Sequence, residues 1–257
     1  MKAVILCGGL GTRLRSVVSD TPKSMAPIGG KPFLMYQINW LKKYNITDII
    51  LCVGYLKDHI KNYFGDGSSF WVTIAYAEEN ELLGTAGAIK NAQPLINDTF
   101  IVLNGDTYAK IDFTKFVEFH TRKQSSYTIG LAKVTDTSRY GLVHLNEDEK
   151  VVSFSEKTNI KQAGYINGGV YIFEPNIFDH IPANKVISLE QEVIPQLIAE
   201  TVYGHVWDGT FIDMGVPESY HQLQKEILRS LFVRKDNSVR EVLIRMDKAS
   251  LGIALVV

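Results

Sequence analysis

The first half of the chain alternates short, continuously apolar runs with longer segments whose apolar residues recur at helical spacing. The apolar runs predict buried strands at residues 2–7, 48–54, 72–77 and 100–103. The periodic segments predict helices at residues 31–44, 57–64, 85–95 and 113–123. Because strands and helices alternate, this half predicts a parallel sheet covered by helices, and the apolar strands fit burial on both faces.

After about residue 125 the pattern changes to a series of strands with few helices between them. The expected strands are residues 127–134, 141–145, 151–154 and 164–173, and the expected helices are residues 188–200 and 218–229. We therefore predict an α/β core with a mixed second half, forming one domain over residues 1–231.

The last segment, residues 232–257, differs from the rest of the chain. A polar linker is followed by a short amphipathic segment at 238–246, expected to be helical, and by an apolar run at 252–257, expected to be a strand. A strand at the last residue lacks its neighbours, so we expect the beginning of a further module that is cut short.

Composition and charge narrow the class of protein. Apolar residues make up 46% of the 257 residues and charged residues 21%, which excludes disordered, collagen-like and mini-protein classes. The formal net charge of −1 gives no global attraction for nucleic acid or an anionic membrane, so neither is expected as a partner. Without a signal-peptide layout or an apolar run of roughly 18 residues, the chain is expected to be cytoplasmic. Cys7 and Cys52 lie in apolar runs and predict buried free thiols.

The strongest candidate chemistry follows the first strand. Gly8, Gly9 and Gly11 allow a ligand to approach the backbone closely and be met by its N–H groups, and a helix starting next would add its dipole. Arg13 and Lys23 add positive charge. Three glycines with two cations predict a site for linked phosphates, and the alternative is a plain tight turn.

Two familiar phosphate motifs do not fit these residues. A dinucleotide fingerprint starting at Gly9 requires glycine at position 14, which is Leu14. A P-loop ending at Gly30-Lys31 requires glycine at position 25 and Ser or Thr at position 32, which are Met25 and Pro32.

A second candidate is Asp106, which follows the strand at 100–103. A carboxylate at the carboxyl end of a parallel strand lies where open α/β sheets bind ligands. With phosphate oxygens completing the shell, Asp106 and Asp213 could hold Mg²⁺, although either could also be an ordinary turn residue. The six histidines show no metal-binding spacing, so zinc is not expected.

Three weaker signals are the segments LGTAG (83–87), SEK (155–157) and INGG (166–169). The first fits a helix start against a flat ring or a phosphate, and the others place polar side chains at strand ends, where sugar hydroxyls could bind. Helix packing and turn chemistry explain each of them equally well.

Taken together, the motifs match a known family. KAVILCGGLGTRL with PK, LLGTAGAI, FIVLNGD, FSEK, INGGVYIF and FIDMGVPESY occur in that order over roughly residues 1–230. The chain resembles the sugar-1-phosphate nucleotidyltransferases, also called sugar-nucleotide pyrophosphorylases. This resemblance implies a Rossmann-like three-layer sandwich with a mostly parallel, mixed central sheet.

Within the family, LLGTAGAI is similar to the guanylyltransferase branch that handles mannose-type sugars. The segment RSVVSDTPKSMAPIGGKPFL and the short catalytic chain are most similar to members that act on heptose 1-phosphate. Cys7 stands where the family often has Ala, and Thr158 where it often has Pro. The tail SVREVLIRMDKASLGIALVV resembles the beginning of a cystathionine-β-synthase-type module.

The resemblance also implies substrates and roles. The substrates would be a nucleoside triphosphate, with GTP favoured, and a sugar 1-phosphate, with Arg13, Lys23 and Asp106 catalytic and Mg²⁺ held by Asp106 and Asp213. The implied nucleotide-binding residues are Leu6, Gly8, Gly9, Gly11, Thr12, Arg13, Lys23, Gly84, Thr85, Asn104 and Gly105. The implied sugar-phosphate-binding residues are Tyr140, Gly141, Glu156, Lys157, Asn167 and Gly168. The family and the aromatic-rich helices also lead us to expect a homo-oligomer.

Several alternatives stay open at this stage. The same chemistry could act on mannose 1-phosphate with GTP, or on glucose 1-phosphate with UTP, CTP or dTTP, because base choice depends on a few hydrogen bonds around residues 78–86. A non-catalytic sugar-nucleotide sensor would not need Arg13, Lys23, Asp106 and Asp213. A glycosyltransferase usually carries an Asp-x-Asp motif, and none is apparent in the sequence.

Overall fold

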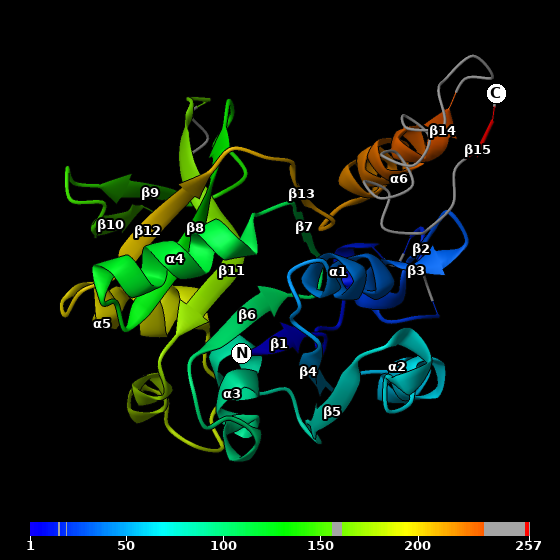
Figure 1. Ribbon diagram of the computed structural model, residues 1–257, viewed down its shortest axis with the longest axis horizontal. Coiled ribbons are helices and arrows are strands. Elements are labelled where there is room, and N and C mark those ends of the chain that lie inside the picture. Colours follow the sequence, from blue (N-terminus) through cyan, green and yellow to red (C-terminus); the bar gives the residue numbers. More distant parts are fainter. Residues whose placement is uncertain (15, 19, 156–160, 234–254, 257) are drawn as a thin grey trace.

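The computed structural model describes residues 1–14, 16–18, 20–155, 161–233 and 255–256. Within these residues a nine-stranded mixed sheet runs through the molecule, with helices on both of its faces (Figure 1). Its strands are β1 (Lys2–Leu6), β4 (Asp48–Val53), β5 (Thr73–Glu78), β6 (Phe100–Asn104), β8 (Tyr127–Val134), β9 (Leu142–Leu145), β10 (Val151–Ser155), β11 (Gly164–Phe173) and β12 (Tyr203–Trp207). The α-helices are α1 (Phe33–Lys42), α2 (Lys57–Phe64), α3 (Gly84–Asn91), α4 (Phe113–Lys123), α5 (Ile194–Ile198) and α6 (Pro217–Leu231).

The N-terminal part of the sheet is parallel. Strand β1 pairs in parallel with β4 and β6, and β4 pairs in parallel with β5. Ala3 and Ile5 face one side of the sheet and Val4 the other, and all three are fully buried, which explains why this strand is continuously apolar. Since Leu6 pairs with Asn104, the carboxyl ends of β1 and β6 meet at one edge. Open α/β sheets bind their ligands at such an edge.

Helices cover both faces and make three layers. On one face Ile38 of α1, Ile60 of α2 and Phe116 of α4 join one apolar core. On the other, Ile89 of α3 and Leu197 of α5 join a second core. The predicted Rossmann-like three-layer sandwich with a mostly parallel, mixed sheet is thus confirmed.

Strand β11 connects the two halves of the sheet. Along one side it runs antiparallel to β6 over residues 170–173 and to β9 over residues 165–166. Along its other side it runs antiparallel to β8. Its register shifts between Asn167 and Tyr171, and Gly169 has a φ of +65°. A β-bulge bends a strand and redirects its side chains. This one lies beside Asn104, because a Cβ at Gly169 would come within 2.9 Å of the Asn104 amide nitrogen.

Most predicted elements are found, with differences at their ends. The helices expected at 57–64 and 113–123 coincide with α2 and α4. The helix expected at 31–44 is shorter, because Lys31–Pro32 form strand β3 with β2 (Pro27–Ile28) and α1 ends at Lys42. The helix expected at 188–200 is split into a π-helix, Leu189–Val193, and α5.

The antiparallel pair β7 (Thr107–Ala109) and β13 (Phe211–Asp213) was not predicted, and neither was β12. In the tail, β14 (Phe232–Val233) pairs with β15 (Leu255–Val256), while the helix expected at 238–246 lies outside the described residues. The module that the tail resembles therefore stays a prediction.

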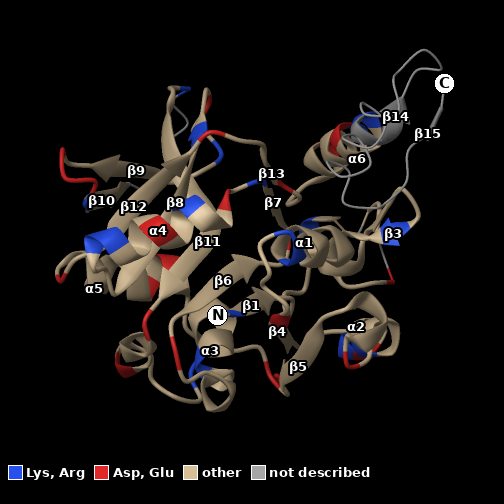
Figure 2. Ribbon diagram, in the orientation of Figure 1, with Lys and Arg blue, Asp and Glu red and all other residues tan. Residues whose placement is uncertain are grey.

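Two further expectations concern buried thiols and membrane spans. Cys7 and Cys52 are buried and free, as predicted. Among the described residues, no helix combines the length and apolarity needed to cross a membrane. Basic and acidic residues are interspersed over the described elements (Figure 2).

Candidate active site

The predicted glycine turn leaves β1 at the ligand-binding edge of the sheet. Gly11 has a φ of +58° and a Cβ there would lie 3.2 Å from the Lys23 Cβ, so the backbone and the packing both favour glycine at this position. A Cβ at Gly9, in contrast, meets no protein atom within 4 Å. Packing does not demand glycine there, and the open space leaves the backbone accessible to a ligand. The turn is followed by a short 3-10 turn, Thr12–Leu14, and not by an α-helix whose dipole would favour phosphate.

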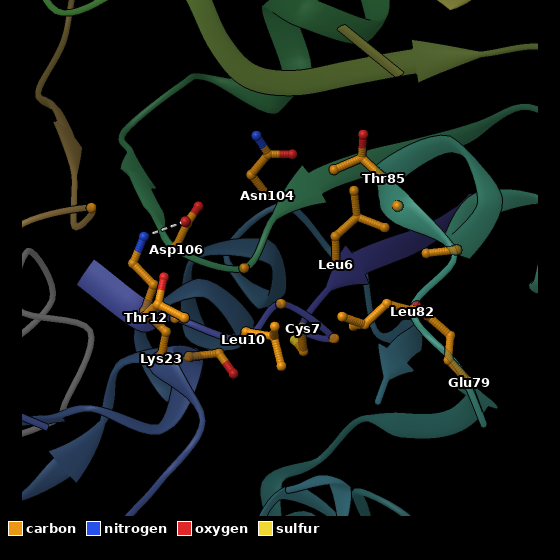
Figure 3. A pocket seen from close by; sticks show the side chains of 18 of the residues that line it. Leu6, Cys7, Leu10, Thr12, Lys23, Glu79, Leu82, Thr85, Asn104 and Asp106 are labelled. Carbon is orange, nitrogen blue, oxygen red and sulfur yellow. Dashed lines mark hydrogen bonds and ion pairs between the residues drawn. The ribbon is translucent and has the colours of Figure 1, made fainter. Parts of the chain in front are cut away.

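The turn forms the floor of a cavity of about 520 Å³. Every residue predicted to bind the nucleotide lines this cavity, namely Leu6, Gly8, Gly9, Gly11, Thr12, Arg13, Lys23, Gly84, Thr85, Asn104 and Gly105. Lys23 and Asp106 lie at one end and Glu79 and Leu82 at the other (Figure 3). The cavity therefore has a charged end suited to phosphates and a more apolar end suited to a base.

Glu79, which none of the sequence motifs indicated, also lines this cavity. It is 7% exposed, and its Oε2 accepts a hydrogen bond of 3.0 Å from the backbone N–H of Leu83. Burial raises the pKa of this carboxyl, which the bond from Leu83 opposes. Three glutamates occur at positions 78–81, and the pattern alone does not indicate which one faces the cavity.

The segment LGTAG owes its glycines to close packing. Gly84 has a φ of +72°, and a Cβ there would lie 2.4 Å from the carbonyl oxygen of Ile187. At Gly87 a Cβ would lie 2.8 Å from the carbonyl oxygen of Lys185. The alternative of helix packing is therefore correct for both glycines, although Gly84 also lines the cavity.

A second cavity, of about 480 Å³, adjoins the first. Of the residues predicted to bind the sugar phosphate, Tyr140, Gly141 and Asn167 line this cavity. Gly168 does not line it, because it packs against Trp207, whose ring atoms would lie 2.0 Å from a Cβ there. The neighbouring Gly169 lines the cavity instead.

Other lining residues of the second cavity were missed, and two predicted residues cannot be placed. The missed residues are Thr107, Phe154, Gly169, Ser188, Glu190, Gln191, Pro195 and Phe211. Glu156 and Lys157 lie outside the described residues, so their roles stay predictions. Ser188, Glu190 and Gln191 belong to the segment ISLEQEV, residues 187–193. Its pattern predicts a helix but does not indicate that these polar side chains face a cavity.

The two cavities meet at Arg13, Asn104 and Asp106, which line both. The unpredicted β7–β13 pair brings the two candidate carboxylates together, since Asp213 pairs with Thr107 and the Met214 N–H donates to the Asp106 carbonyl at 2.9 Å. The Lys23 ammonium pairs with Asp106 (Figure 3). It also lies 3.9 Å from the Asp213 carboxylate. The predicted catalytic and metal-binding side chains therefore form one cluster.

Gln37 supports this cluster from behind. It is buried in α1, and its Nε2 donates to the carbonyl oxygens of Asn104 at 2.9 Å and Thr107 at 3.0 Å. These two bonds fix both ends of the turn that carries Asp106.

The electrostatics of the cluster fit a divalent cation. Burial raises the pKa of Asp213, the charge of Asp106 raises it further, and Lys23 and Arg13 oppose the shift. Two carboxylates that repel each other become compatible when a cation lies between them. The described residues contain no group of three His, Cys, Asp or Glu side chains that could hold a metal, so a cation here requires phosphate oxygens as further ligands.

Comparisons with known proteins find relatives that match most of the chain. A family model described as nucleotidyl transferase matches residues 2–230. Over 224 residues the chain is 42% identical to D-glycero-alpha-D-manno-heptose 1-phosphate guanylyltransferase of Campylobacter jejuni, which covers 86% of this chain and 97% of that protein. It is 37% identical to mannose-1-phosphate guanylyltransferase of Mycobacterium tuberculosis, covering 89% of this chain and 65% of that protein.

A solved structure is also similar. HddC from Yersinia pseudotuberculosis, complexed with GMP-PN, superimposes with a TM-score of 0.78 at 38% identity. The match covers 88% of this chain and 98% of that one.

Proposed function

The chain belongs to the nucleotidyl transferase family, and we propose that it transfers GMP from GTP to D-glycero-D-manno-heptose 1-phosphate and releases pyrophosphate. The observation that carries the proposal is the pair of cavities that meet at Arg13, Asn104 and Asp106. One cavity has room for the nucleotide and the other for the sugar phosphate. The product, a GDP-heptose, would serve bacterial surface polysaccharide synthesis, and because GTP is a cytoplasmic metabolite the reaction would occur in the cytoplasm.

The proposed reaction requires two anions to meet. An oxygen of the sugar 1-phosphate attacks the α-phosphorus of GTP and forms a new P–O bond. The bond from the α-phosphorus to the bridging oxygen breaks, and its electrons leave with pyrophosphate. Such a displacement depends on positioning and charge neutralisation more than on a protein nucleophile.

The residues at the meeting point suit these needs. The backbone N–H groups of Gly8, Gly9 and Gly11 would hold the triphosphate, and Arg13 would stabilise the charge that grows on the leaving pyrophosphate. Lys23, beside both carboxylates, would contact phosphates near the attacked centre. The positions of these side chains in the lining of the two cavities support these assignments.

We also propose that Asp106 and Asp213 hold Mg²⁺ when the nucleotide is bound. Bound there, the cation would supply charge neutralisation between the two substrates. Calorimetric titration of Mg²⁺ in the presence of GTP tests this assignment. Asp106→Asn should remain folded, lose most of the Mg²⁺ binding and lose activity, and undiminished Mg²⁺ binding would reject Asp106 as a ligand.

Glu79 supports the choice of guanine. A carboxylate accepts hydrogen bonds only, and guanine presents two neighbouring donors, N1–H and the exocyclic amino group. Uracil, thymine, cytosine and adenine offer no such pair on that edge. Glu79 lines the end of the cavity away from Lys23, where a base would lie (Figure 3).

We expect Glu79→Gln to lower kcat/KM for GTP at least tenfold relative to UTP, because the amide replaces one acceptor with a donor. Glu81→Gln is the matched control, since Glu81 is exposed and does not line the cavity. An equal loss for GTP and UTP would exclude Glu79 as the residue that reads the base.

A pyrophosphate-release assay tests the function as a whole. GTP, UTP, CTP and dTTP are each combined with heptose 1-phosphate, mannose 1-phosphate and glucose 1-phosphate. We expect the highest kcat/KM for GTP with heptose 1-phosphate. A preference for mannose 1-phosphate would indicate the activity named for the Mycobacterium tuberculosis relative, and nucleotide binding without any pyrophosphate release would indicate a sensor.

A further inference from the structure

Glu190 lies between the two cavities on an unusual helical turn. It belongs to the π-helix Leu189–Val193, which follows Ser188, and Ser188, Glu190 and Gln191 line the second cavity. π-Helical turns are rare and occur frequently at functional sites. Glu190 is half-buried, so its carboxylate faces both the protein and the cavity.

One oxygen of this carboxylate contacts Thr85, a residue that lines the first cavity. The hydroxyl of Thr85 donates to Glu190 Oε2 at 2.8 Å, and Thr85 lines the first cavity at the start of α3. The backbone N–H of Leu189 in turn donates to the Thr85 Oγ1 at 2.7 Å. The position of the Thr85 side chain is therefore fixed by two bonds from the π-helical turn.

The other oxygen contacts Tyr171, which is hydrogen-bonded to Asn167 in the lining of the second cavity. The hydroxyl of Tyr171 donates to Glu190 Oε1 at 3.2 Å and accepts a bond of 2.7 Å from the Asn167 Nδ2. Burial, together with the charge of Glu190, raises the pKa of Tyr171 well above its usual value, so this hydroxyl keeps its proton and donates. The Oδ1 of Asn167 accepts from the Gly169 N–H at 3.0 Å, which leaves the amide one orientation.

We propose that Glu190 is a positioning residue that links the two substrate cavities. Through Oε2 it fixes Thr85 in the lining of the first cavity, and through Oε1 and Tyr171 it fixes Asn167 in the lining of the second cavity. The inference rests on the proposed function, because it assigns one substrate to each cavity. A carboxylate suits this place, since the hydroxyls of Thr85, Tyr171 and Ser188 all donate to it.

Steady-state kinetics of Glu190 variants test the link. Glu190→Ala removes both acceptors, and we expect KM for GTP and KM for heptose 1-phosphate each to rise about tenfold, in line with the loss of a hydrogen bond to a charged group. Glu192→Ala is the matched control, because Glu192 lies on the same π-helix, is exposed and accepts only the Ser188 N–H among the described contacts. Its two KM values should stay within twofold of the unaltered protein.

Three further variants test the connection to Thr85 and the connection through Tyr171 separately. Tyr171→Phe should raise KM for the sugar phosphate alone, and Thr85→Val should raise KM for GTP alone. Glu190→Gln keeps the size of the side chain and one acceptor oxygen, so it should raise only one of the two KM values. This variant also keeps the test valid if Glu190→Ala does not fold.

Two kinds of result are distinguished by the design. If the unaltered protein releases no pyrophosphate with any substrate pair, the proposed function is wrong and the inference with it. If the unaltered protein is active but the folded Glu190 variants match Glu192→Ala in both KM values, or lose only kcat, the positioning role alone is overturned.

Discussion

Arg13 is exposed on the glycine turn and lines both cavities, so in the proposed reaction it would lie beside both substrates. Negative charge on the leaving pyrophosphate is larger in the transition state than in bound GTP, so a cation there stabilises that state more than the bound substrates. We expect Arg13→Ala to lower kcat about a hundredfold and to change KM for either substrate less than fivefold. The measurement is pyrophosphate release under saturating GTP, and an unchanged kcat with a raised KM would contradict this role.

Single residues could be predicted where their chemistry is distinctive. Gly9, Arg13 and Asp106 follow strand ends, and few functions explain glycines and cations together at such positions. Glu79 and Glu190 could not be predicted, because a glutamate in a polar segment is most often solvated, and only the folded chain decides which one faces a cavity.

At the scale of elements, the start of α3 depends on close backbone packing. Gly84 combines a positive φ with a Cβ position 2.4 Å from the Ile187 carbonyl oxygen, so alanine there meets both backbone strain and a clash. We expect Gly84→Ala to lower the free energy of unfolding by about 1–3 kcal/mol and to raise KM for GTP, since Thr85 moves with the helix start. Denaturant unfolding and steady-state kinetics measure the two effects.

Gly65→Ala provides the control for this variant. Gly65 also has a positive φ, +53°, but a Cβ there meets no atom within 4 Å. It should therefore show the cost of backbone strain without a change in KM for GTP. Equal effects of the two variants on KM would mean that the contact with Ile187 does not position the nucleotide cavity.

Helix α4 and strand β12 hold two histidines that should remain neutral in the fold. Burial lowers the pKa of His120, although Glu174 opposes the shift, and burial lowers the pKa of His205, which packs on Phe116 and Phe119. Below the ordinary histidine pKa of about 6.5 the unfolded chain takes up protons that the folded chain resists. The free energy of unfolding should therefore fall as the pH drops through 6.5, and above that range the two histidines contribute nothing to its pH dependence.

Thermal unfolding between pH 7.5 and 5.5 measures this effect. In His205→Phe the fall in melting temperature on acidification should be smaller than in the unaltered protein, because one of the two groups is gone. An identical fall would assign the pH dependence to other groups.

Elements with long, strongly patterned sequences were predictable, whereas short ones were not. Helices α2 and α4 match their expected bounds, because their apolar spacing and flanking residues agree. Strands β7 and β13 have three residues each and pair over a long sequence separation, so no local sequence pattern predicts them. This pair nevertheless brings Asp106 and Asp213 together, which explains why the sequence indicated both carboxylates but not how they meet.

At the scale of the whole molecule, the two cavities form one continuous site. A GDP-heptose would occupy both cavities at once, whereas GDP would occupy only the first. We expect GDP-D-glycero-D-manno-heptose to raise the melting temperature more than GDP at the same concentration, because added contacts lower its Kd and stability grows with the logarithm of ligand over Kd. Differential scanning fluorimetry makes the comparison, and equal shifts would show that the sugar gains nothing from the second cavity.

The bulged strand β11 has a consequence for substrate range. Because β11 is hydrogen-bonded to β6, β8 and β9 at once, the part of the second cavity that Asn167 and Gly169 line is held by the central sheet. A bulkier or smaller sugar would then be accommodated at the rim of the second cavity, which we define as Tyr140 and the π-helical turn. Exchange of rim segments between relatives should then alter which sugar is accepted while the phosphate chemistry below stays the same.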